Sequence, residues 1–119
     1  MTGCPVTWVP EHSGQVCDRF HAAIELIGRR WTGAIISSLL KGATRFCEIR
    51  EAIPGISDRL LTERLKELEE NGIVARDVTA SRPPQVSYRL TAKGKALEPA
   101  LDAVGDWAER WGSTQTPAD

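Results

Sequence analysis

SDRLLTERLKELEENG, residues 57–72, is the segment around which the rest of this chain is organised. Leu61, Leu65 and Leu68 recur at intervals of four and three residues, so a helix here has one apolar stripe. At about 100° per residue, the opposite face carries long hydrogen-bonding side chains, Arg59, Thr62, Glu63 and Lys66. The leading serine is a good N-cap, and the closing Asn-Gly pair tolerates the left-handed backbone that ends many helices. The stretch therefore predicts an amphipathic helix with a core side and a polar side.

The segments before this helix predict three more helices, over residues 15–27, 31–40 and 45–53. Their apolar faces would carry Phe20, Ala23, Ile24 and Ile27 in the first, Trp31, Ile35, Ile36, Leu39 and Leu40 in the second, and Phe46, Ile49 and Ile53 in the third. Thr44 is the expected N-cap of the third helix, and Pro54-Gly55 ends it shortly before the amphipathic helix begins. Two helices joined by so short a turn form a helix-turn-helix.

The segments after the amphipathic helix predict a β-hairpin and a long terminal helix. Residues 73–78 and 86–90 favour strands, and the loop between them is polar and stiffened by adjacent prolines. One helix is expected over residues 91–112, capped by its leading threonine and locally kinked at Pro99. Its heptad-like seam, the predicted dimer contact, consists of Leu97, Leu101, Val104, Ala108 and Trp111. The predicted fold class is mainly α with a small β-hairpin, a winged helix-turn-helix with N- and C-terminal helices forming a dimer interface.

The chain of 119 residues fits one domain of ordinary composition, with 41% hydrophobic and 26% charged residues. We expect a flexible arm over residues 1–14, the winged domain over 15–112 and a disordered tail over 113–119. No apolar run approaches the roughly 20 residues of a membrane span, and the three cysteines form neither an even set nor a CxxC pair. The sequence therefore predicts a soluble cytoplasmic protein with free thiols and no membrane partner.

Charge is segregated along the chain, although the net charge is only −1. Residues 29–47 and 78–95 contain basic side chains and no acid, whereas residues 96–119 are predominantly acidic. A DNA-binding protein of low net charge requires such a local basic surface.

Three blocks of the sequence also look familiar: IGRRWTGAIISSLLKGATRFCEI (27–49), IPGISDRLLTERLKELEENGIVAR (53–76) and PPQVSYRLTAKGKAL (83–97). They resemble the HxlR-type winged helix-turn-helix regulators, relatives of the MarR group, and the similarity covers residues 17–111. The resemblance implies a homodimeric bacterial transcription factor whose recognition helix and wing contact operator DNA. Many members are thiol switches that respond to quinones, aldehydes, diamide or hypochlorite through a cysteine just before the first helix, a position that matches Cys17. The family usually has proline next, where this chain has Asp18, whose charge opposes a thiolate.

The polar face of the amphipathic helix is the predicted DNA-reading surface, because a helix of this size fits the major groove of B-DNA. We expect Arg59 and Thr62 to contact base edges and Lys66 to contact a base or a phosphate. Glu63 either accepts from a cytosine amino group or orients Arg59. For the helix alone, a solvated surface is the simpler interpretation, whereas the winged context and the family resemblance favour DNA.

Basic side chains outside that helix complete the predicted surface. Arg45, at the start of the preceding helix, and Arg82, at the hairpin tip, suit contacts with phosphates or the minor groove. The full set of DNA-binding candidates is Arg45, Ser57, Arg59, Thr62, Glu63, Lys66, Arg82 and Arg89. A homodimer would place two recognition helices in successive major grooves of double-stranded operator DNA with an inverted repeat, and we expect it to act as a repressor.

Cys17 is the candidate redox-sensing residue. A thiol in the first turn of a helix lies at the positive end of the helix dipole, which favours the reactive thiolate, and Arg19 and His21 would add to that effect. Cys4 and Cys47 are the candidate partners, although a structural role is expected for Cys47. Oxidation or alkylation by an oxidant, a quinone or another electrophile would change the angle between the two DNA-binding heads. The alternative is an inert, half-buried cysteine.

Metal binding and catalysis have little support in the sequence. Cys17 and His21 lie four residues apart, and Cys4 and His12 could complete a tetrahedral zinc site, but no clustered second pair supports it. The sequence contains no GxSxG, HExxH or glycine-rich phosphate loop. We therefore predict no cofactor, no metal and no enzymatic activity.

Two other functions stay open at this point. The first is a winged-helix protein-interaction module, which the modest net charge and Glu63 on the polar face would suit. The second is a regulator controlled by a small ligand or a metal rather than by a thiol. The tryptophans bear on the second function, because an apolar pocket near them is the alternative to core packing. Trp31 and Trp107 are expected in the core, Trp111 in the terminal seam, and Trp8 across a dimer.

Overall fold

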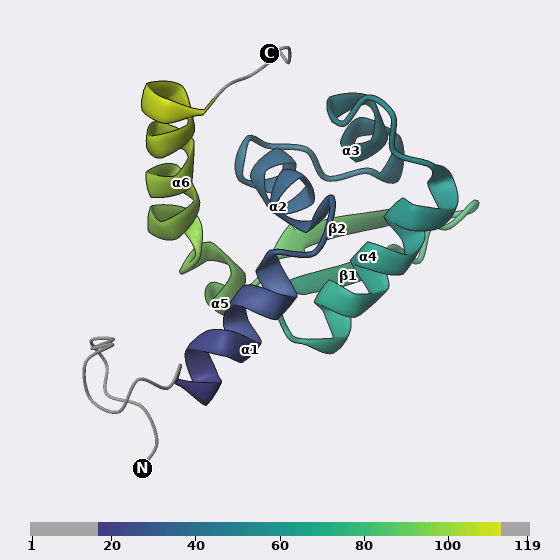
Figure 1. Ribbon diagram of the computed structural model, residues 1–119. Helices are drawn as coiled ribbons and strands as arrows, with labels where there is room; N and C mark the ends of the chain where they lie inside the picture. The colour runs from purple at the N-terminus through teal and green to yellow at the C-terminus, as the bar shows by residue number, and fades with distance from the viewer. Residues whose placement is uncertain (1–16, 113–119) are drawn as a thin grey trace.

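A computed structural model describes residues 17–112 as a helical domain with one β-hairpin (Figure 1). In chain order the elements are α1 (Asp18–Ile27), α2 (Thr32–Leu40), α3 (Phe46–Ala52), α4 (Asp58–Glu70), β1 (Val74–Val78), β2 (Val86–Leu90), α5 (Ala92–Lys95) and α6 (Glu98–Trp111). α3 and α4 form the helix-turn-helix, and β1 and β2 form the wing. This order confirms the predicted mainly α fold with a small β-hairpin, and the dimer interface of the terminal helices stays a prediction. The predicted arm and tail, residues 1–14 and 113–119, lie outside the described residues.

The core lies between α2, α3, α4 and the base of the hairpin (Figure 1). The predicted stripe of α4 faces into it, because Leu61, Leu65 and Leu68 are at most 2% exposed. The other buried apolar side chains are Ile35, Ile36, Leu39, Ile49, Ile53, Ile56, Ile73, Val74 and Leu90. Burial of one such side chain stabilises the fold by about 1.5–3 kcal/mol. α4 is therefore held by its apolar side, and its polar side is left to solvent.

The hairpin is antiparallel and projects outward from the core. Its register runs from Val74 opposite Leu90 at the buried base to the exposed end at Val78. The backbone N–H of Tyr88 donates to the carbonyl of Thr44 at 2.7 Å, so the loop between α2 and α3 is attached to β2. The wing is thus fixed at its base and extends into solvent.

α1 and α2 begin later than predicted. α1 begins at Asp18 with Cys17 as its N-cap, whereas a start near residue 15 was expected. α2 begins at Thr32, because Trp31 has a left-handed backbone with φ 77° that a continuous right-handed helix excludes. Trp31 still packs partly against the core, as predicted.

The predicted terminal helix is two helices. Thr91 acts as a cap as expected, since its Oγ1 accepts from the backbone N–H of Gly94 at 3.1 Å, but α5 ends at Lys95 and α6 begins at Glu98. Pro99 lies in the first turn of α6, where a missing N–H is tolerated. Inside a continuous helix, its ring would clash with the carbonyl four residues earlier. The prediction of one helix with a local kink is therefore wrong.

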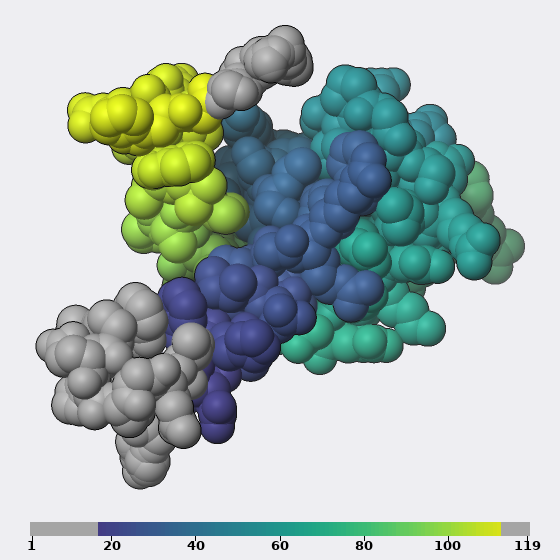
Figure 2. All heavy atoms as spheres, in the orientation of Figure 1, coloured from purple at the N-terminus to yellow at the C-terminus, as the bar shows by residue number. Residues whose placement is uncertain are grey.

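The terminal helices expose apolar side chains. α1 and α6 lie at the edge of the domain (Figures 1 and 2). Large apolar side chains on them with 42% to 69% of their surface exposed are Phe20, Ile24, Val104, Trp107 and Trp111. The placement of Trp107 in the core is therefore wrong. Leu97 and Leu101 do pack against the core. No helix within residues 17–112 has the length and apolar character needed to span a membrane.

Candidate DNA-binding surface and thiol site

The polar side of α4 is exposed on a helix that the core holds from beneath. Ser57 caps it as predicted, since its Oγ accepts from the backbone N–H of Leu60 at 3.1 Å. All the polar-face candidates, Arg59, Thr62, Glu63 and Lys66, are exposed. Arg59 Nε lies 3.5 Å from Glu63 Oε2, so Glu63 orients the guanidinium along the face. The helix thus presents a strip of hydrogen-bonding groups of the kind that a major groove can accept.

An ion pair that the sequence analysis missed joins the two helices of the helix-turn-helix. Arg50 Nη1 on α3 donates to both carboxylate oxygens of Asp58, at 3.0 and 3.2 Å. The hydrogen bond and the charge of Asp58 raise the pKa of Arg50. Asp58 is the first residue of α4, so the pair orients the start of α4 against α3. Both side chains are substantially exposed, and the pair therefore orients the helices more than it stabilises them.

A carboxylate caps the start of α3. The backbone N–H groups of Thr44 and Arg45 donate to Glu48 Oε1, at 2.8 and 3.1 Å. These two hydrogen bonds lower the pKa of Glu48 below its ordinary value. The N-cap residue is Arg45, and the predicted Thr44 cap is wrong, because Glu48 reaches back to both N–H groups as in a capping box.

The start of α3 is also tied to the wing. Arg45 Nη2 donates to Gln85 Oε1 at 2.8 Å. The backbone N–H of Gln85 donates to Thr79 Oγ1 at 3.0 Å, and the backbone N–H of Thr79 donates to the Gln85 carbonyl at 2.8 Å, which closes the wing loop. Arg45, predicted as a phosphate contact, therefore lies where it also positions the wing.

The wing carries exposed arginines on both strands and in its loop. Arg82 is exposed in the loop, as predicted. Arg89 is exposed too, but its Nε lies 2.9 Å from Asp77 Oδ2 on the opposite strand. Arg76, which the sequence analysis omitted, is exposed on β1 opposite Tyr88. α4 contacts β1, so these arginines and the polar face of α4 belong to neighbouring elements.

Cys17 lies at the N-cap of α1, one residue before the first helical turn. Its Sγ accepts from the backbone N–H of Phe20 at 3.5 Å. The residue is disulfide-bonded, so the prediction of free thiols is wrong for Cys17 in this structure. Cys47 is an exposed free thiol on α3, so it is not the partner of Cys17 in this structure. The other predicted partner, Cys4, lies outside the described residues. His21 faces Glu25, with His21 Nε2 at 4.0 Å from Glu25 Oε2.

A metal site finds no support in the part of the chain that the structure describes. Within residues 17–112, no three side chains of His, Cys, Asp or Glu cluster closely enough to hold a metal ion. Cys4 and His12, the other two residues of the zinc alternative, lie outside this range, as does Trp8.

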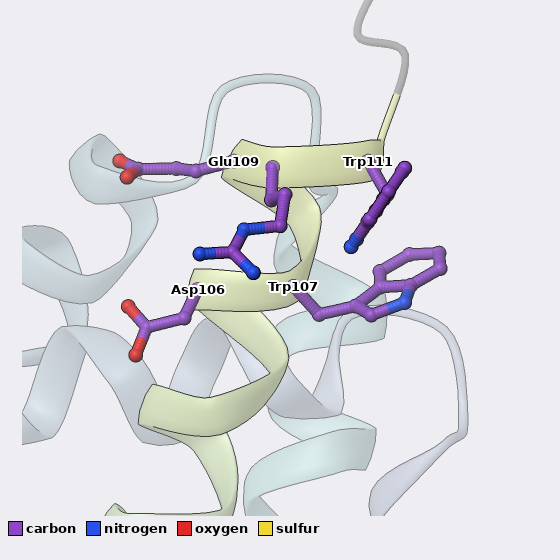
Figure 3. A pocket seen from close by; sticks show the side chains of 5 residues that line it. Asp106, Trp107, Glu109 and Trp111 are labelled. Carbon is purple, nitrogen blue, oxygen red and sulfur yellow. The ribbon is translucent and has the colours of Figure 1, made fainter.

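The exposed end of α6 is two-sided (Figure 3). Trp107 and Trp111 project to one side of the helix, and Asp106 and Glu109 project to the other. The same four residues and Arg110 line a hollow at this end of the helix. Because a single helix supplies all of these residues, the hollow is an open surface rather than an enclosed ligand cavity.

Comparison with known proteins identifies relatives of this architecture. Residues 26–116 match the family described as HxlR-like helix-turn-helix. The uncharacterized HTH-type transcriptional regulator YvaP of Bacillus subtilis (strain 168) is 45% identical over 100 residues, which cover 84% of this chain and 93% of YvaP. The HTH-type transcriptional regulator YodB of the same organism is 46% identical over 96 residues, which cover 81% of this chain and 86% of YodB.

Solved structures of such regulators have the same fold. Reduced YodB from B. subtilis matches with a TM-score of 0.74 at 43% identity, over 86% of this chain and 100% of that chain. Quinone-bound YodB matches with a TM-score of 0.69 at 45% identity, over 81% of this chain and 100% of that chain. The redox regulator HypR in its oxidized form matches with a TM-score of 0.74 at 36% identity, over 82% of this chain and 99% of that chain. These relatives are transcriptional regulators rather than enzymes. The chain described here belongs to the HxlR-like helix-turn-helix family of DNA-binding transcriptional regulators.

Proposed function

We propose that this protein is a homodimeric repressor that binds an inverted-repeat operator and releases it when oxidants or electrophiles react at Cys17. The observation that carries the DNA-binding surface is the exposed strip of α4, on a helix whose opposite side is fixed by buried leucines. Arg59 and Thr62 would read base edges, and Lys66 a base or a phosphate. Ser57, Arg45 and the wing arginines Arg76, Arg82 and Arg89 would hold the flanking phosphates.

The terminal helices would form the dimer. An exposed apolar surface of the kind found on α1 and α6 is typical of a protein-protein contact. Leu97 and Leu101 pack against the core, so we assign the contact to the later part of the predicted seam, Val104, Ala108 and Trp111, and add Trp107. A two-fold axis at this surface would present two α4 helices to grooves about 34–36 Å apart.

Cys17 would act on that surface. It caps α1, whose exposed Phe20 and Ile24 belong to the proposed dimer contact. Diamide would take two electrons and two protons from a pair of thiols and leave a disulfide, whereas a quinone would add to one thiolate and form a single C–S bond. The helix N-terminus favours the thiolate that either reaction needs. Cys17 is disulfide-bonded in this structure, so the sensor would start from the reduced thiol that a reducing cytoplasm maintains until such a compound arrives.

Gel shifts on the DNA upstream of the gene test the sensor. Reduced wild-type protein should bind, and diamide or a quinone should weaken binding by tenfold or more. Cys17→Ser should bind equally well and keep its affinity after treatment. Cys47→Ser, which removes an exposed free thiol, is the matched control and should respond like wild type. If treated Cys17→Ser releases the DNA to the same extent as treated wild type, Cys17 is not the sensor. If genomic site selection yields no specific sequence, the proposal of operator binding is wrong.

Sedimentation of the reduced protein tests the dimer separately. Trp107→Ala and Trp111→Ala should shift the protein toward monomer and weaken operator binding, because each removes a large aromatic contact. Val78→Ala removes another exposed apolar side chain, on the wing, and should leave the dimer intact. A dimer equally stable in both tryptophan variants would exclude this interface.

A further inference from the structure

The segment between α1 and α2, residues 28–31, is bonded to the recognition helix. Arg64 Nε on α4 donates to the carbonyl of Arg30 at 3.1 Å. Arg64 Nη1 also lies 3.4 Å from Glu67 Oε2, and Arg29 Nη2 lies 3.6 Å from the same oxygen. The Arg64 side chain is only 11% exposed, which makes these bonds less screened than surface pairs. One carboxylate of α4 thus holds two guanidinium groups, one from its own helix and one from the segment.

The same segment also lies against the turn of the helix-turn-helix. The tip of the Trp31 ring is next to Gly55, between α3 and α4, where a Cβ would lie 3.8 Å from Trp31 Cη2. The Arg30 guanidinium stacks over the Trp31 ring, 4.9 Å from its centroid. Trp31 holds a left-handed backbone, a strained conformation for a residue with a large side chain. Such a conformation persists where the surrounding contacts impose it, and here the contacts come from the DNA-binding unit.

α1 itself is loosely packed against α4. No residue of α1 is buried within the described chain. An open groove runs between the two helices, and Ala22, Glu25, Leu26, Arg29, Glu67 and Asn71 line it. The bonds to residues 28–31 lie at the α2 end of α1, opposite the end that Cys17 caps. Leu26 is the one residue of α1 that packs against the core within the described chain, so motion of α1 would reach α4 mainly through the segment and its bonds.

We propose that Arg64 and Glu67 are positioning residues that clamp residues 28–31 to the recognition helix and make this segment the connection through which α1 sets the orientation of α4. The proposal rests on the proposed function, because the change it transmits is the one at Cys17. The two side chains occupy the flank of α4 between its buried stripe and its DNA-reading strip. Because Arg64 is nearly buried, it cannot follow a displaced segment without moving the helix that carries it.

Hydrogen exchange in the reduced protein tests the clamp without DNA or oxidant. Arg64→Gln and Glu67→Gln should each speed exchange of the α1 amides severalfold, since α1 loses its attachment to α4. Glu69→Gln makes the same change of charge on the other flank of α4 and should leave exchange unchanged. Glu67→Gln preserves side-chain shape, so it decides the matter if Arg64→Gln fails to fold. If the α1 amides of the folded Arg64→Gln and Glu67→Gln variants exchange at the wild-type rate, the proposed clamp is wrong.

Operator binding before and after diamide tests the transmission. The ratio of oxidised to reduced Kd should fall toward one in Glu67→Gln and in Arg64→Gln. Arg64→Lys should keep part of the response that Arg64→Gln loses, because an ammonium can still donate to the Arg30 carbonyl or to Glu67. A merely structural role would lower both affinities and leave the ratio at its wild-type value, which would overturn the proposal. If wild-type protein does not respond to oxidant at all, the thiol mechanism fails, and hydrogen exchange alone judges the clamp.

Discussion

Gly94 of α5 lies directly against the carbonyl oxygen of Ile73, the residue before β1, and a Cβ has no room between them. The same carbonyl accepts from the backbone N–H of Thr91 at 3.0 Å. A Cβ on Gly94 would also approach Leu90 Cδ2 to 2.9 Å. The base of the wing and the start of the terminal helices therefore meet at a position that only glycine fits.

Gly94→Ala should destabilise the protein by about 1–3 kcal/mol, because backbone or core atoms must shift to admit the methyl group. Urea unfolding at fixed protein concentration measures this loss. Gly105→Ala is the matched control, since nothing lies within 4 Å of a Cβ there. In the interior of α6, that change should be neutral or stabilise by up to about 1 kcal/mol. Equal losses in the two variants would contradict the steric argument.

A double-mutant cycle on Arg45 and Gln85 separates wing positioning from phosphate contact. Gln85→Ala removes the 2.8 Å hydrogen bond and should weaken operator binding by roughly fivefold, about 1 kcal/mol, because the wing loses an anchor. If Arg45 also holds a phosphate, Arg45→Ala should weaken operator binding more than Gln85→Ala does. It should also reduce the slope of log Kd against the logarithm of the salt concentration by about one. Identical losses in Arg45→Ala, Gln85→Ala and the double variant would assign Arg45 to the wing alone.

The α4 strip should divide into base-reading and phosphate-holding residues. Arg59→Ala should cost about 1–3 kcal/mol on the operator and relax the preference at one base position. Lys66→Ala should weaken all sequences alike if it holds a phosphate. Lys95→Ala removes an exposed cation of α5 and should change neither the operator affinity nor the preference at that base position. Binding assays on the operator and on single-base variants measure this, and a uniform loss for Arg59→Ala would reassign it to the backbone.

The cap of α3 should make stability depend on pH through Glu48. Two backbone N–H bonds lower the pKa of this carboxyl, so the carboxylate stabilises the folded state above its ordinary pKa of 4.5. That contribution is lost as the pH falls through the lowered folded-state value. Glu48→Gln should therefore be less stable than wild type at neutral pH, and thermal unfolding should show the difference shrinking below pH 4.5. A difference that stays constant with pH would mean that the charge of Glu48 does not cap α3.

Most of the fold could be predicted from local patterns. The leucine stripe of α4 and its Ser57 cap need only a helical period and one hydrogen-bonding side chain, and both are confirmed. The strands were predicted within a residue of their ends. Pro99 was correctly identified as disruptive, but its effect depends on where the helix restarts, which local sequence does not specify. The helix is therefore interrupted at residues 96–97 instead of being bent.

The order of elements, the helix faces and the candidate residues of the DNA-reading strip could be derived from the sequence, because they follow from periodicity and side-chain chemistry. Which polar groups meet depends on the tertiary structure. The pairs Arg50–Asp58 and Arg45–Gln85, and the hydrogen bond from Arg64 to the Arg30 carbonyl, join residues 8, 40 and 34 positions apart. The tertiary structure also decided that Trp107 faces solvent, since a helical seam has the same spacing whether a core or another surface covers it. Spacing along one helix specifies its faces, whereas contact between distant segments depends on how the whole chain packs.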